Sequence, residues 1–258
     1  MSANLGVAIE GPVATITLDR PEKLNALTMA MLEGLDAACT AIDRDEAVRA
    51  VIVASASPKA FCAGAEILEW GPQGALGMWQ RWIRDGHRAF DRLARLRQPT
   101  IAAIGGIAYG GGLELALACD LRVAAAGARF AFPEVTIGAI PGWAGSQRLP
   151  RLVGAGRAKQ LILAGEPIDA ATAAAWGLVN EVVPADRLAD RALELARRIA
   201  ENAPTAVQAS KQLVDAAGGD GLASAVESLA AGLAASTDDA REGIAAFRGK
   251  RKANYTGK

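Results

Sequence analysis

The sequence has little of the material that several common classes of site require. It contains one histidine in 258 residues, so zinc sites and catalytic triads that depend on histidine are poorly supplied. The three cysteines, Cys39, Cys62 and Cys119, show no metal-ligand spacing, and their odd number does not suggest a disulfide framework. We therefore expect no metal site, and a reducing cytoplasm is the simplest location.

Long apolar runs and an excess of charge are also absent. No run approaches the roughly 18 apolar residues of a membrane-spanning helix, and the first residues lack the basic and apolar stretches of a secretory signal. The 28 basic and 28 acidic side chains cancel, whereas nucleic acids and anionic membranes attract basic surfaces. We expect neither nucleic acid nor a membrane as a partner.

Strand and helix patterns are mixed in the first part of the chain and give way to helices in the last. Residues 7–9 and 13–18 have the pattern of paired strands, and residues 50–54 that of a buried strand. Thr28 is placed to cap a helix whose apolar residues recur at helical spacing. From residue 186 onward, alanine-rich segments, one of them at 222–235, show helical periodicity only. This order predicts an α/β core with a helical C-terminal appendage.

Two short stretches of small residues are suited to hold a carbonyl oxygen. Gly110, Gly111 and Gly112 lie between an apolar strand at residues 100–104 and a helix, and the loop from Ala63 to Ala65 also precedes a helical pattern. Without a Cβ, a glycine lets a ligand approach the backbone, and the first N–H groups of a helix are free. N–H groups that converge from two such loops stabilise an oxyanion. Tight helix packing and a phosphate cradle are the alternatives.

Two glutamates lie in apolar surroundings near these glycines. Glu114 falls in a helix that is apolar nearly all round, and Glu134 follows Pro133 at the end of an aromatic strand. A buried carboxylate without a partner has a raised pKa. Two carboxyl groups in one dry pocket have their pKa values pushed apart, which provides one acid and one base. Each glutamate alone would suit a structural hydrogen bond; the two together favour catalysis.

Taken together, these motifs resemble the enoyl-CoA hydratase/isomerase (crotonase) superfamily over nearly the whole chain. The segments that carry the resemblance are, in order, Arg20-Pro21, Asn25-Ala26-Leu27, residues 61–65, residues 110–115, Cys119-Asp120, residues 132–134, Ile140-Pro141-Gly142, residues 147–149, residues 177–179, Glu242-Gly243, Phe247 and residues 250–252.

The resemblance implies a fold, an assembly and a substrate class. The implied fold is α/β, a spiral of ββα units over residues 1–195 with a C-terminal helical trimerisation region over 196–258, in a homotrimer or homohexamer. The implied substrate is an acyl-CoA thioester. Because coenzyme A is part of this substrate, no separate cofactor is expected.

The resemblance also assigns roles to residues of this chain. It makes the N–H groups of Ala65 and Gly111 the oxyanion hole, and Glu114 and Glu134 the pair that handles water. The implied activity is that of an enoyl-CoA hydratase, a lyase of fatty acid β-oxidation that adds water syn to a trans-2-enoyl-CoA and yields a 3-hydroxyacyl-CoA. Further substrate contacts are expected at Leu24, Ala63, Gly64, Gly110, Gly142, Trp143 and Lys250.

Other functions remain open at this point. Isomerases of the family generally work with one carboxylate, so two favour hydration over a Δ3-Δ2 enoyl-CoA isomerase or another enolate-forming crotonase. A non-catalytic acyl-CoA-binding or RNA-binding protein is the alternative outside catalysis. A dehalogenase branch uses a histidine near His87, but it needs an aspartate where this chain has Gly142, so we expect His87 to be a surface or packing residue.

Three positions depart from the family pattern. Glu66 and Leu68 stand where an aspartate and often a lysine are usual, which weakens any claim of a coenzyme A phosphate contact there. Trp143 stands where small residues are usual. Its indole would narrow the acyl pocket and favour short or unusual acyl groups, or else serve as a core or interface side chain.

Overall fold

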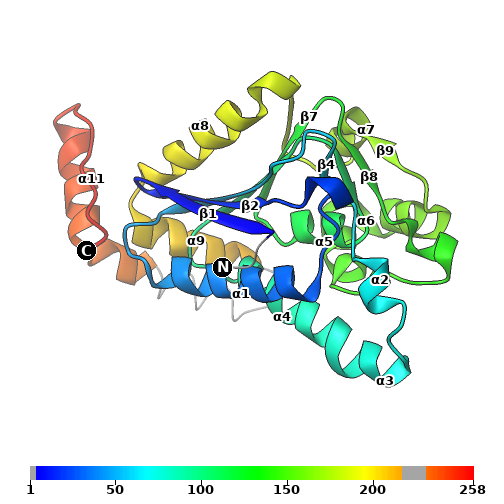
Figure 1. Cartoon of the computed structure of the whole chain (residues 1–258). Helices are drawn as coiled ribbons and strands as arrows, with labels where there is room; N and C mark the ends of the chain where they lie inside the picture. Colours follow the sequence, from blue (N-terminus) through cyan, green and yellow to red (C-terminus); the bar gives the residue numbers. More distant parts are fainter. Residues whose placement is uncertain (1–3, 217–230) are drawn as a thin grey trace.

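The computed structural model describes residues 4–216 and 231–258, which form a mixed α/β fold (Figure 1). One sheet has the strand order β1-β2-β3-β5-β7-β10 and a second has the order β4-β6-β8-β9. The first sheet comprises β1 (Leu5–Glu10), β2 (Val13–Leu18), β3 (Ala50–Ser55), β5 (Thr100–Ile104), β7 (Leu121–Ala125) and β10 (Glu181–Val183). The second comprises β4 (Ala60–Cys62), β6 (Ile107–Tyr109), β8 (Arg129–Ala131) and β9 (Ile168–Asp169).

Helices connect and cover the sheets. They are α1 (Met29–Arg44), α2 (Ile67–Trp70), α3 (Ala75–Gly77), α4 (Ile83–Ala94), α5 (Gly111–Leu117), α6 (Gly145–Ala164), α7 (Ala170–Ala175), α8 (Leu188–Ala200), α9 (Pro204–Ala216) and α11 (Asp238–Arg248). Short turns of other helix types are η1 (Pro21–Lys23), η2 (Met78–Trp82), η3 (Pro133–Ile137) and η4 (Ala185–Arg187). Of these, η2 is a π-helical turn. As predicted, the side chain of Thr28 caps α1 by accepting the N–H of Met31.

Successive strand pairs generate the two sheets. The pairs β3 and β4, β5 and β6, and β7 and β8 each place one strand in the first sheet and the next in the second. The pairings β2–β3, β3–β5 and β5–β7 are parallel, and the β1–β2 hairpin is antiparallel. The chain thus advances one strand per turn in both sheets, which confirms the predicted spiral of ββα units.

The central strands of the first sheet, β3, β5 and β7, are buried on both faces, as expected for parallel strands. On β3, Val51 and Val53 belong to the main core, whereas Ala50 and Ile52 belong to a second cluster under α8. The alternation follows from the two-residue period of a strand. Apolar side chains on both faces therefore explain the continuous apolar run at residues 50–54.

Three predicted element boundaries were wrong. The strand β6, absent from the prediction, lies between β5 and the three glycines, so β5 does not lead directly into α5. The small residues at 61–66 predict a loop, but Phe61 and Cys62 belong to β4. The apolar pattern at 178–183 predicts a last strand of six residues, of which only Glu181–Val183 form one.

The described C-terminal part is helical up to Arg248, and a tail without regular structure follows it. The helix predicted at 222–235 lies largely outside the described residues. Helix α8 runs across residue 195 and packs on the first sheet, so the division into 1–195 and 196–258, which stays a prediction, would pass through this helix. Helix α11 stands away from the core in Figure 1. Its buried Asp239 accepts the backbone N–H groups of Thr256 and Gly257, which ties the tail to α11.

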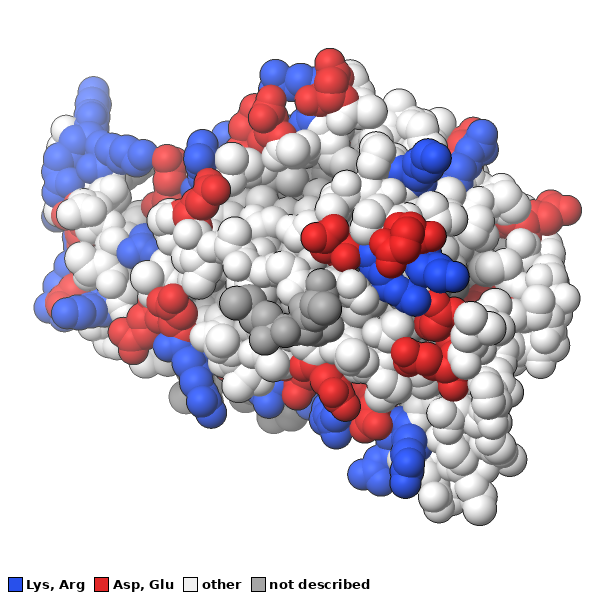
Figure 2. All heavy atoms as spheres, in the orientation of Figure 1, with Lys and Arg blue, Asp and Glu red and all other residues white. Residues whose placement is uncertain are grey.

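Charge is unevenly distributed on the face shown in Figure 2. Residues 71–80, which include α3, contain no Lys, Arg, Asp or Glu, and the surface at this end of the molecule is white. Basic side chains gather at the opposite end, over α11, and residues 248–258 carry five basic residues and no acidic one. Within the described residues, no helix combines the length and the apolar character needed to cross a membrane.

Candidate active site

A cavity of about 150 Å³ opens where the two small-residue stretches and both glutamates meet. Most of the predicted site residues line it, namely Ala63, Gly64, Ala65, Gly110, Gly111, Glu114, Glu134, Gly142 and Trp143. Segments about 80 residues apart in the chain therefore form one site.

The first side of the cavity is the loop after β4. Leu27 pairs with Ala65 through two backbone hydrogen bonds, from Leu27 N–H to the Gly64 carbonyl at 2.7 Å and from Glu66 N–H to the Leu27 carbonyl at 2.8 Å. Because N–H groups alternate in direction along an extended segment, the Ala65 N–H points away from Leu27. Within residues 4–216 and 231–258 this N–H donates to no backbone carbonyl.

The second side is the N-terminus of α5. Gly111 is the first helical residue, so its N–H has no partner within the helix. A Cβ added to Gly111 would lie 3.4 Å from the Ala65 nitrogen, and one added to Gly64 would lie 3.7 Å from the Gly111 nitrogen. The two backbone nitrogens therefore lie close together at the cavity.

The glycines at this point are needed for close approach. Gly110 has a φ of +49°, and a Cβ on it would lie 2.8 Å from Glu134 Oε1. A Cβ on Gly112 would overlap the Cys62 carbonyl oxygen of β4. The backbone conformation at Gly110 and the helix–strand contact at Gly112 thus both require glycine. Tight packing, the alternative explanation for the three glycines, is therefore correct, and it holds in addition to their position at the cavity.

Glu114 is almost completely buried on α5, with 2% of its surface exposed. Its Oε1 accepts the N–H groups of Trp143 and Gly145, each at 2.7 Å. Burial raises the pKa of this carboxyl group to about 7, although the two N–H groups favour the ionised form. At neutral pH both the protonated and the ionised forms of Glu114 are therefore populated.

Glu134 lies in the first turn of η3, directly after β8. Its Oε2 is buried and has no hydrogen-bond partner in the described part of the chain. Burial, and secondarily the negative charge of Glu114, raise the pKa of Glu134 to about 7. The cavity is thus bordered by two carboxyl groups with raised pKa values, one with two N–H donors on its Oε1 and one whose Oε2 has no partner among the described residues.

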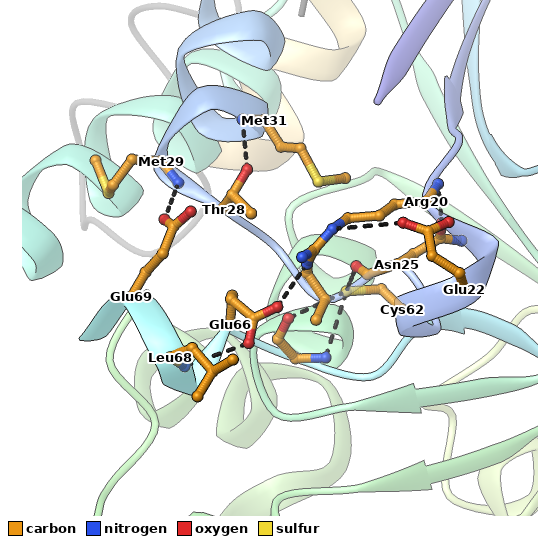
Figure 3. Close-up of polar contacts among 12 residues, drawn as sticks. Arg20, Glu22, Asn25, Thr28, Met29, Met31, Cys62, Glu66, Leu68 and Glu69 are labelled. Atoms are coloured by element: carbon orange, nitrogen blue, oxygen red, sulfur yellow. Dashed lines mark hydrogen bonds and ion pairs between the residues drawn. The ribbon is translucent and has the colours of Figure 1, made fainter. Parts of the chain in front are cut away.

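Two polar residues, Asn25 and Arg20, hold the segment that pairs with Ala65, although the sequence analysis gave them no role (Figure 3). Asn25 is fully buried with a left-handed φ of +58°. Its amide donates to Ser55 Oγ at 2.7 Å and to the Phe61 carbonyl at 3.0 Å, and its Oδ1 accepts the N–H of Arg20. Asn25 therefore ties the segment that pairs with Ala65 to β3 and β4.

The second support is an ion pair between Arg20 and Glu66. Arg20 Nη1 lies 2.7 Å from Glu66 Oε2 and 2.9 Å from the Ala26 carbonyl, while Glu66 Oε1 accepts the N–H of Leu68 (Figure 3). The hydrogen bond from Arg20 holds the pKa of Glu66 below its usual value. The motifs Arg20-Pro21 and Asn25-Ala26-Leu27 could have indicated this supporting role in the sequence, since they place Arg20 and Asn25 close to Leu27.

Three singled-out residues do not line the cavity. Leu24 lies beside it, with its carbonyl accepting the N–H of Ala63 at 2.9 Å. Lys250 lies in the tail after α11, and His87 is half-buried on α4. Conversely, the cavity is lined by apolar side chains that were not predicted, among them Met78 and Trp82 of η2. Their spacing in the sequence is that of any helix that faces a core, so it gave no indication that they line a cavity.

Comparisons with known proteins agree with this geometry. The family model for enoyl-CoA hydratase/isomerase matches residues 8–258. The chain is 44% identical over 245 residues to the short-chain-enoyl-CoA hydratase of Clostridium acetobutylicum, covering 94% of each chain. It is 39% identical over 261 residues to the crotonyl-CoA hydratase of Syntrophomonas wolfei, covering 99% of this chain and 98% of the other.

Solved structures give the same result. The crystal structure of an enoyl-CoA hydratase from Bacillus anthracis superposes with a TM-score of 0.95 at 39% identity, covering 99% of this chain and 100% of the other. Sequence and fold thus agree over nearly the full length, and the chain belongs to the enoyl-CoA hydratase/isomerase family.

Proposed function

We propose that the protein is an enoyl-CoA hydratase that adds water across the double bond of a trans-2-enoyl-CoA to give a 3-hydroxyacyl-CoA. The observation that carries the proposal is the pair Glu114 and Glu134, which border one cavity with pKa values of about 7. Relatives named as short-chain and crotonyl-CoA hydratases support it. The reaction is a step of fatty acid β-oxidation.

In this proposal the N–H groups of Ala65 and Gly111 hold the thioester oxygen. This oxygen gains negative charge as an enolate forms, so fixed N–H dipoles lower the barrier, by about 3–4 kcal/mol for each donor. The support comes from the adjacency of the two nitrogens and from the missing backbone acceptor for the Ala65 N–H among the described residues.

The two glutamates divide the proton transfers. The N–H groups of Trp143 and Gly145 stabilise the carboxylate form of Glu114, so this group accepts a proton from the water whose oxygen bonds to the β-carbon. Glu134 has no donor on its buried Oε2 among the described residues, which favours its protonated form, and it delivers the proton to the α-carbon. Proton exchange with solvent then returns Glu114 to its ionised and Glu134 to its protonated state.

Coenzyme A is proposed to bind as part of the substrate, with no separate cofactor. The backbone at Leu24 lies beside the cavity, and Lys250 belongs to the basic tail. We propose that residues 196–258 assemble the protein into a homotrimer or homohexamer. Helix α11, which stands away from the core and exposes 86% of Phe247, supports an intersubunit role for this region (Figure 1).

The test is hydration of crotonyl-CoA, followed as loss of the absorbance of the conjugated thioester. We expect wild type to be active, and Glu114→Gln and Glu134→Gln to lose on the order of 10²–10⁴-fold in kcat. Glu46→Gln, at an exposed glutamate beyond α1, is the control and should retain the wild-type rate.

Three outcomes would contradict the proposal. Full activity of Glu134→Gln would remove this glutamate from the mechanism. Binding of coenzyme A esters without turnover of any enoyl-CoA would favour a binding protein. A gain of conjugated absorbance from a 3-enoyl-CoA, with no hydration, would instead identify an isomerase.

A further inference from the structure

The cavity has an apolar inner end and an open mouth. At the mouth, the side chains of Ile67, Ile137 and Ile140 are exposed, Ile140 by 77%. At the inner end, Trp82 and Trp143 are buried, with 1% of Trp143 exposed. A chain that extends inward from the two N–H groups therefore meets the indole of Trp143.

This indole is fixed by several independent contacts. Its Nε1 donates to the Trp82 carbonyl at 3.2 Å. Its ring centroid lies 5.6 Å from that of Trp82 and 5.3 Å from that of Phe90, the latter in an edge-to-face arrangement. Aromatic neighbours and a satisfied N–H hold the ring in one orientation, so it forms a rigid wall.

Two glycines make room for the indole. A Cβ on Gly86 of α4 would overlap Nε1 of Trp143, and a Cβ on Gly111 would lie 2.7 Å from Cζ3. The ring therefore spans the space between α4 and the N-terminus of α5. A Cβ on the neighbouring Gly142 would lie 2.7 Å from Ile83 Cδ1, so the side chain of Ile83 on α4 packs against the backbone next to the indole.

We propose that Trp143, seated against Gly86, ends the acyl pocket and restricts the substrate to short chains, of about four to six carbons. The inference rests on the proposed hydratase function. The whole cavity, which includes the space beside the two glutamates, has a volume of about 150 Å³. An apolar cavity of that volume holds one benzene molecule, about six carbons, so an acyl chain that fits inside is short. Each methylene that the pocket rejects costs about tenfold or more in kcat/KM.

The experiment measures kcat/KM for crotonyl-, hexenoyl-, octenoyl- and decenoyl-CoA. Wild type should show a steep fall beyond hexenoyl-CoA. Trp143→Ala should raise the ratio of octenoyl- to crotonyl-CoA by at least about tenfold. Because the Glu114 contact uses the backbone N–H of Trp143, the substitution leaves that hydrogen-bond donor in place.

Two further variants separate the wall from a general loosening of the core. Val123→Ala truncates a buried side chain in the separate cluster under α8, none of whose residues lines the cavity, so it should lower stability and leave the chain-length ratio unchanged. Gly86→Ala should push the indole toward the cavity and lower the ratio of hexenoyl- to crotonyl-CoA. Trp143→Phe is the milder substitution if the alanine variant does not fold, and it should raise the octenoyl ratio by a smaller factor.

The outcomes are distinct. An unchanged ratio in folded Trp143→Ala and Trp143→Phe, or an equal rise in Val123→Ala, would overturn the role of Trp143. A wild-type optimum at octenoyl- or decenoyl-CoA would do the same while leaving the hydratase proposal intact. Absence of hydration at every chain length would refute the proposed function itself.

Discussion

The ion pair between Arg20 and Glu66 gives a quantitative prediction about the Ala65 loop. The two side chains are 14% and 11% exposed, and their closest N and O atoms lie 2.7 Å apart (Figure 3). Removing one partner of a buried pair costs about 3–5 kcal/mol, because the other charge is left without compensation. Arg20 keeps its hydrogen bond to the Ala26 carbonyl, so we expect Glu66→Ala to lower the free energy of unfolding by about 3 kcal/mol.

The same substitution should slow the reaction. Glu66 follows Ala65 directly, and its own N–H completes the pairing with Leu27. A shift of about 1 Å in a catalytic group costs on the order of 100-fold in rate. Because the thioester oxygen is held most strongly in the transition state, the loss should fall on kcat and leave KM nearly unchanged. Glu66→Gln, which keeps an acceptor oxygen for Arg20, should lose less of both stability and rate.

Chemical denaturation and crotonyl-CoA hydration measure the two effects on the same samples. Glu22→Ala is the matched control, because Glu22 also faces Arg20, at 3.9 Å, but its side chain is 66% exposed. It should change the free energy of unfolding by no more than about 0.5 kcal/mol and leave kcat as in wild type. A Glu66→Ala protein that loses the expected stability yet keeps the wild-type kcat would refute a role in positioning Ala65.

Two predictions concern the pH dependence of the glutamate pair. Because the reaction needs Glu114 ionised and Glu134 protonated, kcat/KM should follow a bell-shaped curve with its maximum near pH 7. Glu134→Gln should lose the alkaline limb of this curve. A Glu134→Gln profile that retains both limbs would contradict the assignment. Both pKa values are raised from 4.5, so the folded protein binds more protons than the unfolded chain between pH 4.5 and 7, and the free energy of unfolding should fall as the pH rises through that window. The loss in the free energy of unfolding is at most about 3 kcal/mol for each group. The test is chemical denaturation at several pH values. If the free energy of unfolding of a Glu114→Gln/Glu134→Gln variant depends on pH as steeply as that of wild type, the two glutamates are not the origin of the dependence.

Much of the fold was predictable because its signals are local. The side chain of Thr28 caps α1 as its position before an apolar helix suggested, and the apolar run at residues 50–54 forms a strand. The three-residue strand β6 escaped prediction because Ile107–Tyr109 is too short to show a period. Its neighbours in the second sheet come from other turns of the spiral, and such pairing leaves no mark in a single stretch of sequence.

The same distinction applies to the site. Glu114 and Glu134 stood out because a carboxylate in apolar text is unusual, and they do border one cavity. Asn25 and Arg20 were noted only as members of motifs and were given no role, because polar residues in a turn are ordinary. Their importance comes from burial and from partners on β3 and β4, which only the folded chain brings near. Likewise, the sequence showed that Trp143 has a large side chain, but not that Gly86 on α4 leaves room for it.

The position of α8 has a consequence for how the protein is made. Ile52, Ile101 and Val123 lie on the sheet face that α8 covers with Ala192 and Ala196. A ribosome completes all three strands long before it reaches Ala200, the last residue of α8. During that interval a nascent chain presents an uncovered apolar sheet, the kind of surface that leads to aggregation and that chaperones bind. Synthesis that stops before Leu188 should therefore give an insoluble product rather than a smaller enzyme.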